Sequence, residues 1–342
     1  MGLFGRKDIT GIDIGAGSIK VVRIARGGRR PKLLSAGLVE FPLDPAKTSS
    51  VTADLKYLLS GKKIGGKNVF TLMPGKQLTI RSLILPKMPQ AELREAVRWE
   101  SKRHISYPLE AALIEYLILG EKKEGLVDKY DLLMVAAERG TVTEHLLPFR
   151  EAGIAVSAVD ANPLALRNVY RNRKKTDGAN NLIVDIGAGK TEINIFNGSS
   201  LRFSRCLETG GFEMTRAVSE QLNIGLQEAE DVKHRVDVLS PPDDDKVVAA
   251  VRGRLDAILL EIRRSIEYYK TTFREKGVER TILTGGVSLM TGIKEYFSLS
   301  LEGPVELDNP FAGLSCKENI LQEFGPAAAR FSAAVGLALR AV

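Results

Sequence analysis

Two segments of the sequence carry the same Asp-Ile-Gly-Ala-Gly motif, at 13–17 and at 185–189. In each copy a β-branched apolar run precedes the aspartate and another follows the glycines, so each motif is predicted to form the turn of a β-hairpin. Glycine lets the main chain come close to a phosphate, and successive N–H groups in such a turn bind anions. The motif is therefore typical of a phosphate-binding loop.

The repetition makes this interpretation specific. A single glycine-rich hairpin is more often an ordinary turn, but two matching copies predict two related α/β halves that aim the same loop at a shared cleft. Asp13 and Asp185 are expected to hold Mg²⁺ through its water ligands, since a carboxylate repels phosphate, whereas the positive charge of Lys20 suits phosphate. The residues expected to bind phosphate are Gly15, Ala16, Gly17, Ser18 and Lys20 in the first loop, and Gly187, Ala188, Gly189 and Lys190 in the second.

A third glycine-rich element, Leu283-Thr-Gly-Gly-Val287, lies between a predicted strand and a predicted short helix. Bare backbone in such a turn can lie along a flat base or a ribose. Alone, the segment fits a structural turn better than a binding site. In third place after two phosphate loops, it predicts that Gly285, Gly286 and Val287 contact adenosine.

The elements expected around the first motif alternate strands and helices. A hairpin at 9–24 is followed by a strand at 33–41, a helix at 50–60 and a strand at 68–73. Residues 78–159 then follow as strand, helix, two strands, helix and strand, an order that can close a small α+β subdomain on itself. This block is predicted to be inserted into the first half.

The second motif lies in a hairpin at 181–197, and helices are expected at 211–222 and 227–235. Apolar residues at steps of three and four predict one long amphipathic helix from 248 to 273. The remaining predicted elements are a polar, basic linker at 171–180, an acidic helix-capping loop at 241–245, a strand at 280–283 and a final helix at 330–339.

The predicted parts of the chain follow from this order. They are a first subdomain with phosphate loop 1 at 8–77, the inserted subdomain at 78–159, a connecting helix and linker at 160–180, a second subdomain with phosphate loop 2 at 181–210, a mostly helical subdomain at 211–279, and the remainder of the second subdomain with the adenosine motif and a second connecting helix at 280–342.

The composition fits a globular protein, with 342 residues, 44% hydrophobic and 27% charged residues. No apolar run approaches the roughly 20 residues that cross a bilayer, and residues 1–7 lack a secretory signal, fitting either a frayed terminus or a weak docking segment. The two cysteines, Cys206 and Cys316, are far apart and lack the spacing of metal ligands, which indicates a cytosolic protein with reduced thiols. The net charge of +7 predicts some attraction to acidic surfaces such as lipid headgroups or acidic partner segments. The sequence shows no nucleic-acid-binding module beside the basic clusters at 26–30 and 171–175, so no nucleic-acid binding is expected.

Together the motifs resemble the five-part signature of the actin/Hsp70/sugar-kinase superfamily, which spans residues 12–339 here. The matching segments are the phosphate motifs 13–20 and 185–192, the adenosine motif 283–287, and the two connecting helices at 160–166 and 331–339. The resemblance implies an α/β, actin-like and ribonuclease-H-like, two-domain ATPase fold that binds ATP and Mg²⁺ between its halves. Small residues in the connecting helices would let them cross closely at a hinge.

The inserted block at 78–159 is similar to the subdomain that the bacterial FtsA and PilM families carry and that actin and Hsp70 lack. Residues 3–7, 85–89 and 98–100 resemble PilM sequences. FtsA ends in a membrane helix, whereas this sequence ends three residues after the second connecting helix. The chain is therefore identified as a member of the PilM family. An FtsA-like cell-division filament protein and a small-molecule kinase are the alternatives.

Membership of the PilM family implies a cytoplasmic protein of type IV pilus assembly, peripheral at the inner membrane and held there by its partners. Its implied partner is the N-terminal cytoplasmic tail of PilN, and it would link the inner-membrane platform to motor components. The sequence leaves open whether copies of the chain associate. The block at 78–159 has no obvious sugar-site pattern, which counts against the kinase.

Two positions depart from the ATPases of the superfamily and predict at most slow ATP hydrolysis. Lys190 stands where relatives commonly have threonine; it fits both a phosphate ligand and an outward-pointing exposed lysine. Asn162 stands near the place of the glutamine or glutamate that orients the attacking water, and it fits a helix cap as well. Glu192 matches an acidic position that could support the Mg²⁺ shell. Asp13, Asp185, Glu192 and Asn162 are thus the catalytic candidates.

Two further pairs of residues are expected at the nucleotide. Glu230 and Lys233 match a pair that holds the adenine or ribose in relatives, although three residues apart on a helix they fit an ordinary surface ion pair equally well. Gly210 and Gly211, at the start of a predicted helix, are also expected at the nucleotide.

Overall fold

The computed structural model describes residues 8–26, 30–43, 50–61, 64, 68–125, 127–172, 178–240 and 245–340. The docking segment or frayed terminus considered at 1–7 lies outside the described residues, as does most of the capping loop at 241–245. The basic clusters at 26–30 and 171–175 and the linker at 171–180 lie partly outside them.

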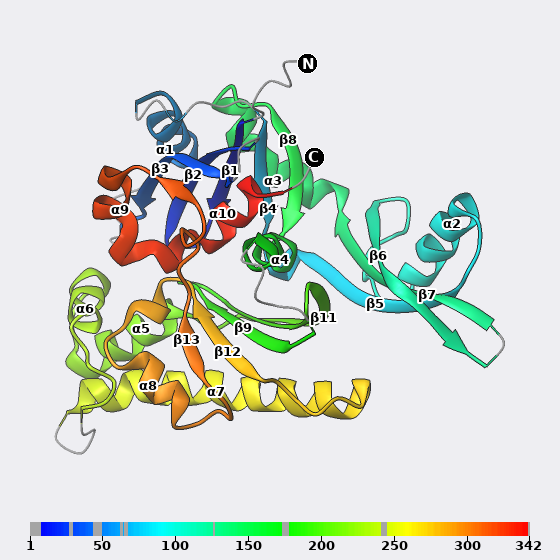
Figure 1. The fold of residues 1–342 in the computed structure, drawn as a ribbon. Helices are drawn as coiled ribbons and strands as arrows, with labels where there is room; N and C mark the ends of the chain where they lie inside the picture. Colours follow the sequence, from blue (N-terminus) through cyan, green and yellow to red (C-terminus); the bar gives the residue numbers. More distant parts are fainter. Residues whose placement is uncertain are drawn as a thin grey trace.

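Two large sheets with the same topology form the body of the protein (Figure 1). Each begins with a three-stranded antiparallel meander, and two further strands then add in parallel on the side of the first strand of the meander; the first sheet has one more short strand, which pairs in parallel with the third strand of its meander. The first sheet has the order β14 (Ser315–Cys316), β3 (Lys32–Glu40), β2 (Ser18–Ala25), β1 (Asp8–Ile14), β4 (Val69–Met73) and β8 (Val156–Ala161). The second has the order β11 (Ser200–Leu207), β10 (Thr191–Asn197), β9 (Asn180–Ile186), β12 (Arg280–Thr284) and β13 (Val305–Leu307). We call these sheets, with their helices, the first and second halves.

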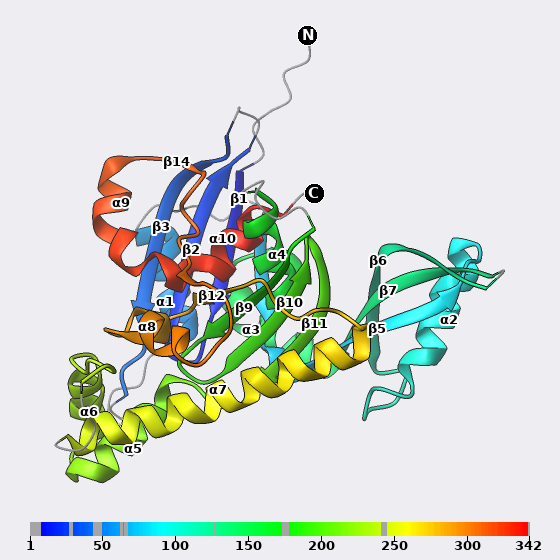
Figure 2. The ribbon, with the colours of Figure 1, turned by 60° about the horizontal axis from the view of Figure 1, so that its bottom comes forward.

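The long amphipathic helix predicted from the apolar spacing is confirmed as α7 (Lys246–Phe273). Its buried residues recur at three- and four-residue steps and pack into the core of the second half. Asp245 caps it by accepting hydrogen bonds from the N–H groups of Val247 and Val248. Figure 2 shows this helix running along the second sheet toward the inserted subdomain. Shorter helices complete the second half: α5 (Gly211–Leu222), α6 (Leu226–Lys233) and α8 (Ile293–Ser298).

The two connecting helices cross between the halves, as predicted. They are α4 (Asn162–Asn172) and α10 (Ser332–Ala338). On α4, Ala165 packs into the core of the first half and Leu166 into a cluster with the second sheet. On α10, Gly336 lies so close to α4 that a Cβ atom there would come within 2.0 Å of the Ala165 carbonyl oxygen. A residue without a side chain is therefore required at this crossing.

The inserted subdomain is smaller than the expected range of 78–159. A three-stranded sheet of order β5 (Leu78–Pro86), β7 (Val127–Glu138) and β6 (Ala112–Glu124) is covered by α2 (Gln90–Ser101), and it projects from the body (Figure 1). The next elements, α3 (Arg139–Glu151) and β8, belong to the first half instead. Phe149 of α3 is buried in that core, and β8 pairs with β4. The order of elements was predicted correctly, but the block does not close on itself.

The C-terminal segment also differs from the expectation that residues 280–342 complete the second half. The chain returns to the first half after β13, where β14, α9 (Glu318–Phe324) and α10 all pack. The strands β11, β13 and β14 and the helix α9 were not predicted. The remaining described elements are α1 (Val51–Lys56), a π-helical turn at Tyr57–Gly61, and the 3₁₀ turns Gly75–Gln77, Val287–Leu289 and Gly325–Phe331. In the described ranges, none of the helices is long and apolar enough to cross a membrane.

Substituting Gly336 with alanine tests the helix crossing. The added methyl group must push α10 away from α4, and overpacking of this kind costs about 1–3 kcal/mol. We expect Gly336→Ala to lower the melting temperature by at least ~3 °C in thermal unfolding. The matched control is Gly253→Ala on α7, where a Cβ atom meets nothing within 4 Å. That change should leave stability unchanged or raise it, since alanine is the better helix former; equal melting temperatures for the two variants would contradict the close crossing.

Candidate functional site

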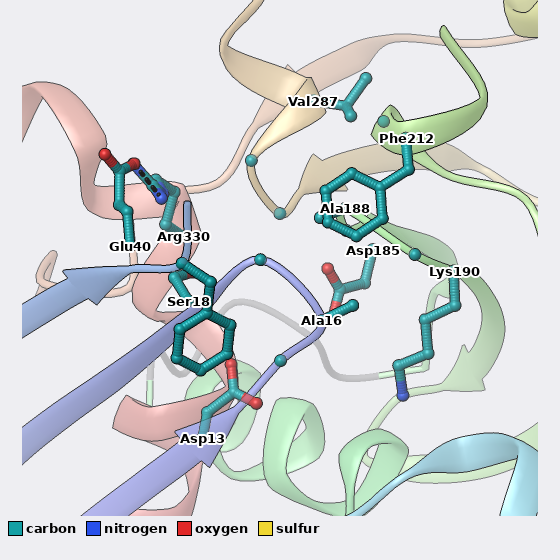
Figure 3. A pocket seen from close by; sticks show the side chains of 18 of the residues that line it. Asp13, Ala16, Ser18, Glu40, Asp185, Ala188, Lys190, Phe212, Val287 and Arg330 are labelled. Carbon is teal, nitrogen blue, oxygen red and sulfur yellow. Dashed lines mark ion pairs between the residues drawn. The ribbon is translucent and has the colours of Figure 1, made fainter. Parts of the chain in front are cut away.

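The two predicted phosphate loops face each other across the boundary between the halves (Figure 3). A Cβ atom on Gly17 would lie 2.9 Å from Cβ of Ala188, and one on Gly189 would lie 2.9 Å from Cβ of Ala16. Each alanine thus packs on the glycine of the opposite loop. The prediction that both loops meet at one cleft is confirmed, and the second glycine of each motif is required by the opposite loop.

The two loops also have the same internal geometry. In the first, Gly15 N–H donates to the Ser18 carbonyl at 2.9 Å; in the second, Gly187 N–H donates to the Lys190 carbonyl at 2.9 Å. Both turns close antiparallel hairpins, β1–β2 and β9–β10, in equivalent register. The sequence repeat is therefore a repeat in three dimensions.

A cleft of about 1260 Å³ opens around the loops. Most of the site residues predicted from the sequence line it: Asp13, Gly15, Ala16, Gly17, Ser18, Lys20, Asn162, Asp185, Gly187, Ala188, Gly189, Lys190, Gly211, Glu230, Lys233, Gly285, Gly286 and Val287. The two exceptions are Gly210 and Glu192, which lie beneath the surface of the cleft. A Cβ atom on Gly210 would come within 2.6 Å of the Gly187 carbonyl oxygen, so this glycine supports loop 2 from behind.

Each loop has an aspartate at the end of its strand. Asp13 is paired with Lys20, at 3.1 Å between Oδ2 and Nζ, directly across the β1–β2 hairpin. The lysine neutralises the carboxylate and still lines the cleft. In the second half the position equivalent to Lys20 is Glu192, which faces Asp185 across β9–β10. The two hairpins therefore place opposite charges beside equivalent aspartates.

Asp185 belongs to a buried polar cluster. Asn162 donates from Nδ2 to Asp185 Oδ2 at 2.7 Å and to Glu192 Oε2 at 3.0 Å, and Lys190 Nζ forms an ion pair with Glu192 Oε1. Burial and the nearby Glu192 carboxylate raise the pKa of Asp185 to about 6. The cluster therefore carries more negative charge than its own bases neutralise, and it is suited to receive a cation.

Of the two alternatives considered for Lys190, the outward-pointing exposed lysine is not what the structure shows, whereas its role as a phosphate ligand stays a prediction. Lys190, labelled in Figure 3, lines the cleft, and its ammonium group forms an ion pair with the buried carboxylate of Glu192. Burial lowers the pKa of Lys190, but the Glu192 carboxylate outweighs that effect and raises it above the ordinary value. The positive charge of Lys190 is therefore neutralised by Glu192, while the residue still lines the cleft.

The pair Glu230 and Lys233 is buried at the cleft rather than exposed on the surface. Lys233 Nζ lies 2.6 Å from Glu230 Oε2 and 3.0 Å from Thr215 Oγ1, and its side chain is only 7% exposed. Burial lowers the pKa of Lys233 despite the adjacent carboxylate. Burial alone would raise the pKa of Glu230, but hydrogen bonds from His234 and Lys233 lower it to about 2. The surface ion pair considered from the sequence is therefore wrong.

The expected adenosine turn follows β12 at the end of the second sheet. Gly285 has a φ of +85°, and a Cβ atom there would lie 2.4 Å from the Ile186 carbonyl oxygen. Gly286, in contrast, meets nothing within 4 Å, so its backbone is open to the cleft. The first glycine thus forms the turn, and the second leaves room for a flat group.

Several cleft residues were not predicted from the sequence. Arg330 NH2 forms a 2.7 Å ion pair with Glu40 Oε1 at the rim (Figure 3), and Leu43 N–H donates to Gln227 Oε1 from the opposite half at 3.4 Å. Phe212, at the start of α5, packs beside Gly17. These residues come from segments far apart in the chain, and none belongs to a repeated motif. Only Phe212 could have been suspected from the sequence, because it directly follows the predicted site glycines Gly210 and Gly211.

The acidic groups fit a hydrated Mg²⁺ better than a directly liganded metal. Within the described ranges, no three His, Cys, Asp or Glu side chains are grouped as metal ligands. Asp13 and Asp185 both line the cleft, and the buried Oδ1 of Asn162 beside them has no hydrogen-bond partner. Two carboxylates and a free amide oxygen can accept hydrogen bonds from metal-bound water, which is how Mg²⁺ is often held beside phosphates.

A family model described as type IV pilus assembly protein PilM matches residues 11–342. The chain belongs to the PilM family. The solved structure described as "PilM-PilN type IV pilus biogenesis complex" is similar to it, with 26% identity and a TM-score of 0.83, covering 98% of this chain and 99% of that chain. The predicted family is therefore confirmed, and the role of this PilM-family chain lies in type IV pilus assembly.

More distant matches confirm the actin-like ATPase fold. The ethanolamine utilization protein EutJ of Carboxydothermus hydrogenoformans has a TM-score of 0.57 at 16% identity, covering 99% of this chain and 91% of EutJ. The cell division protein FtsA of Neisseria meningitidis is 29% identical over 177 residues, which is 45% of this chain and 41% of FtsA. The chain thus spans less than half the length of this curated relative.

Because burial and Glu192 disfavour the ionised form of Asp185, replacing this carboxylate with a neutral amide is expected to stabilise the fold. Its folded pKa of about 6 exceeds the unfolded value of 3.8, so the ionised form destabilises the fold above about pH 6, and the penalty disappears as the pH falls toward 4. Without ligands, Asp185→Asn should raise the melting temperature by at least ~3 °C at pH 7.5 and by much less at pH 4.5. The exposed Asp128→Asn is the control and should change it at neither pH. A pH-independent gain would refute the electrostatic cause.

Proposed function

We propose that the chain is an ATP-binding scaffold of the type IV pilus assembly machine. It binds the N-terminal cytoplasmic tail of a PilN protein and links the inner-membrane platform to motor components. In this proposal the protein is cytoplasmic and is held at the inner membrane by its partners. The observation that carries the proposal is the reciprocal contact of two identical phosphate loops at one cleft, between halves of the same topology.

Several features of the cleft support a nucleoside triphosphate as its ligand. Both loops present main-chain turns to the same space, where successive N–H groups can bind phosphate oxygens. The open backbone at Gly286 suits the base or ribose, and the buried Lys233 and Glu230 offer a donor and an acceptor beside it. The solved MreB5 structure of Spiroplasma citri, which shares the fold at a TM-score of 0.50 and 13% identity, is described as bound to ADP.

Asp13 and Asp185 would hold Mg²⁺ through its water ligands, with Asn162 Oδ1 as a further acceptor. When bound, the ion would neutralise phosphate charge and draw the two halves together. It would also relieve the excess negative charge of the Asp185 cluster, because a cation lowers the cost of ionising a buried carboxyl.

Hydrolysis is proposed to be slow. A base that activates water must take up a proton, and the amide of Asn162 cannot do so. Its Nδ2 group is already engaged by Asp185 and Glu192. Glu192 itself is buried, paired with Lys190 and absent from the cleft wall. In this proposal the nucleotide therefore acts mainly by binding.

The PilN partner is proposed from the similarity to the PilM–PilN complex, which extends over nearly the whole length of both chains. The inserted subdomain projects from the body, with β5 and β6 as the edge strands of its sheet and α2 packed on it. Trp99 on α2 is 63% exposed, unusually high for so large a ring. In this proposal the PilN tail attaches at this subdomain.

The magnesium role of Asp13 is tested by isothermal titration calorimetry with a non-hydrolysable ATP analogue. Asp13→Asn should weaken binding at least ~10-fold in the presence of Mg²⁺ and much less in EDTA, since only the metal-dependent part is lost. Asp8→Asn is a matched control, because Asp8 lies on the same strand and pairs with Arg23 of β2 at 2.7 Å, away from the cleft. Equal Mg²⁺ dependence in parent and Asp13→Asn would overturn the assignment.

The pilus role is tested with a synthetic peptide of the N-terminal tail of a PilN from the same organism. We expect the parent to bind it, while a peptide of the same composition and scrambled order does not. Measuring peptide affinity with and without the ATP analogue then reports whether the two sites are coupled. No peptide binding in either state would overturn the scaffold proposal and leave the nucleotide site intact.

A further inference from the structure

The inserted subdomain belongs to the first half in sequence, yet it docks on the second half at two points. At the outer point, Asp131 of β7 pairs with Arg202 of β11 and with Lys122 of β6. Leu133 packs beside them, in one cluster with Phe196 and Leu201 of the second half. These contacts fix one end of the subdomain to β11.

The inner point lies at the turn that leads into β5. A Cβ atom on Gly75 would lie 2.6 Å from Glu192 Oε1 and 3.3 Å from Cys206 Sγ. Glu192 and Cys206 are cross-strand neighbours on β10 and β11. The turn therefore rests on the edge of the second sheet, directly against the carboxylate that pairs with Lys190.

One carboxylate thus touches both the nucleotide loop and the base of the inserted subdomain. Its Oε2 accepts a hydrogen bond from Asn162, while Oε1 is shared between the ion pair with Lys190 and the contact with Gly75. Lys190 is the last residue of phosphate loop 2 and lines the cleft. The Glu192 side chain is almost fully buried, so loss of its partner leaves an uncompensated charge in the interior.

We propose that Lys190, Glu192 and Gly75 form a relay that reports the terminal phosphate of a bound nucleotide to the inserted subdomain. The proposal rests on the proposed function, since it needs the cleft to bind nucleotide. With a diphosphate, Lys190 stays with Glu192 and the turn at Gly75 stays docked. With a triphosphate, Lys190 turns to the additional phosphate.

The exchange of partners is favoured because a terminal phosphate carries more charge than one carboxylate. Lysine is a compact point charge on a flexible stem, and it can move between two anions on the same wall. Glu192 then keeps the hydrogen bond from Asn162 to Oε2, but its Oε1 has lost the lysine and needs water or another donor. Since Gly75 lies against this oxygen, water reaches it when the side chain moves out from under Gly75. The turn at Gly75 and the following strand β5 consequently loosen.

Hydrogen–deuterium exchange of the full chain tests the relay, with saturating ADP or a non-hydrolysable ATP analogue, each with Mg²⁺. In the parent we expect the analogue to speed exchange over Leu78–Pro86 at least ~3-fold relative to ADP. Lys190→Met should abolish this difference and reduce the preference for the analogue over ADP. Lys270→Met is its control, because Lys270 pairs with Glu267 at 2.8 Å on the exposed side of α7.

Gly75→Ala tests the last step separately. Its methyl group collides with Glu192, so β5 should exchange rapidly with either nucleotide, whereas Gly120→Ala in β6, where a Cβ atom meets nothing within 4 Å, should behave as the parent does. An equal rate with ADP and analogue in the parent, or a nucleotide-dependent difference that survives in Lys190→Met, overturns the relay. Absence of any nucleotide binding by calorimetry overturns the proposed function instead, so the two failures are distinguishable.

Discussion

The two halves can approach closely only because nothing larger than a methyl group stands between their loops. The methyl group of Ala16 packs on Gly189 and that of Ala188 packs on Gly17, so each loop contributes one alanine and one glycine to the contact. The same constraint holds at the hinge, where Gly336 lets α10 lie against the backbone of α4. With these contacts in place, the strand ends, the turn at Gly285 and Gly286 and the buried ion pair of α6 face one cleft.

Charge is arranged differently on the two sides of this contact. The first half balances its aspartate within one hairpin, Asp13 against Lys20. The second half places two carboxylates together and shares one lysine and one amide among them. One side of the cleft is thus nearly neutral, and the other stores negative charge that a cation can relieve. The charge of the second half is therefore the more sensitive to a bound cation, and the inserted subdomain contacts that half.

Much of this architecture could be predicted from the sequence, because it depends on local pattern. The paired hairpins follow from β-branched runs around identical glycine motifs, and α7 follows from its apolar spacing. Membership of the family followed from motif order, and most of the site residues that the motifs predicted do line the cleft. The limits of the insertion did not, because β8 and α3 have the same local pattern whether they pair with β5 or with β4. The partner of Lys190 and the contact of Gly75 with Glu192 are likewise tertiary, and β13 and β14 are too short to have a pattern of their own.

The equivalent topology of the two sheets has an evolutionary consequence. A chain whose halves share strand order, hairpin register and loop sequence is the expected product of the duplication and fusion of one ancestral unit, which would have paired with a copy of itself about a two-fold axis. In such a dimer both hairpins would have carried the same residue opposite the aspartate. The present chain has lysine in one copy and glutamate in the other, at positions 20 and 192. Such a fusion would free each copy to diverge, and the two halves of this chain differ in charge at this equivalent position.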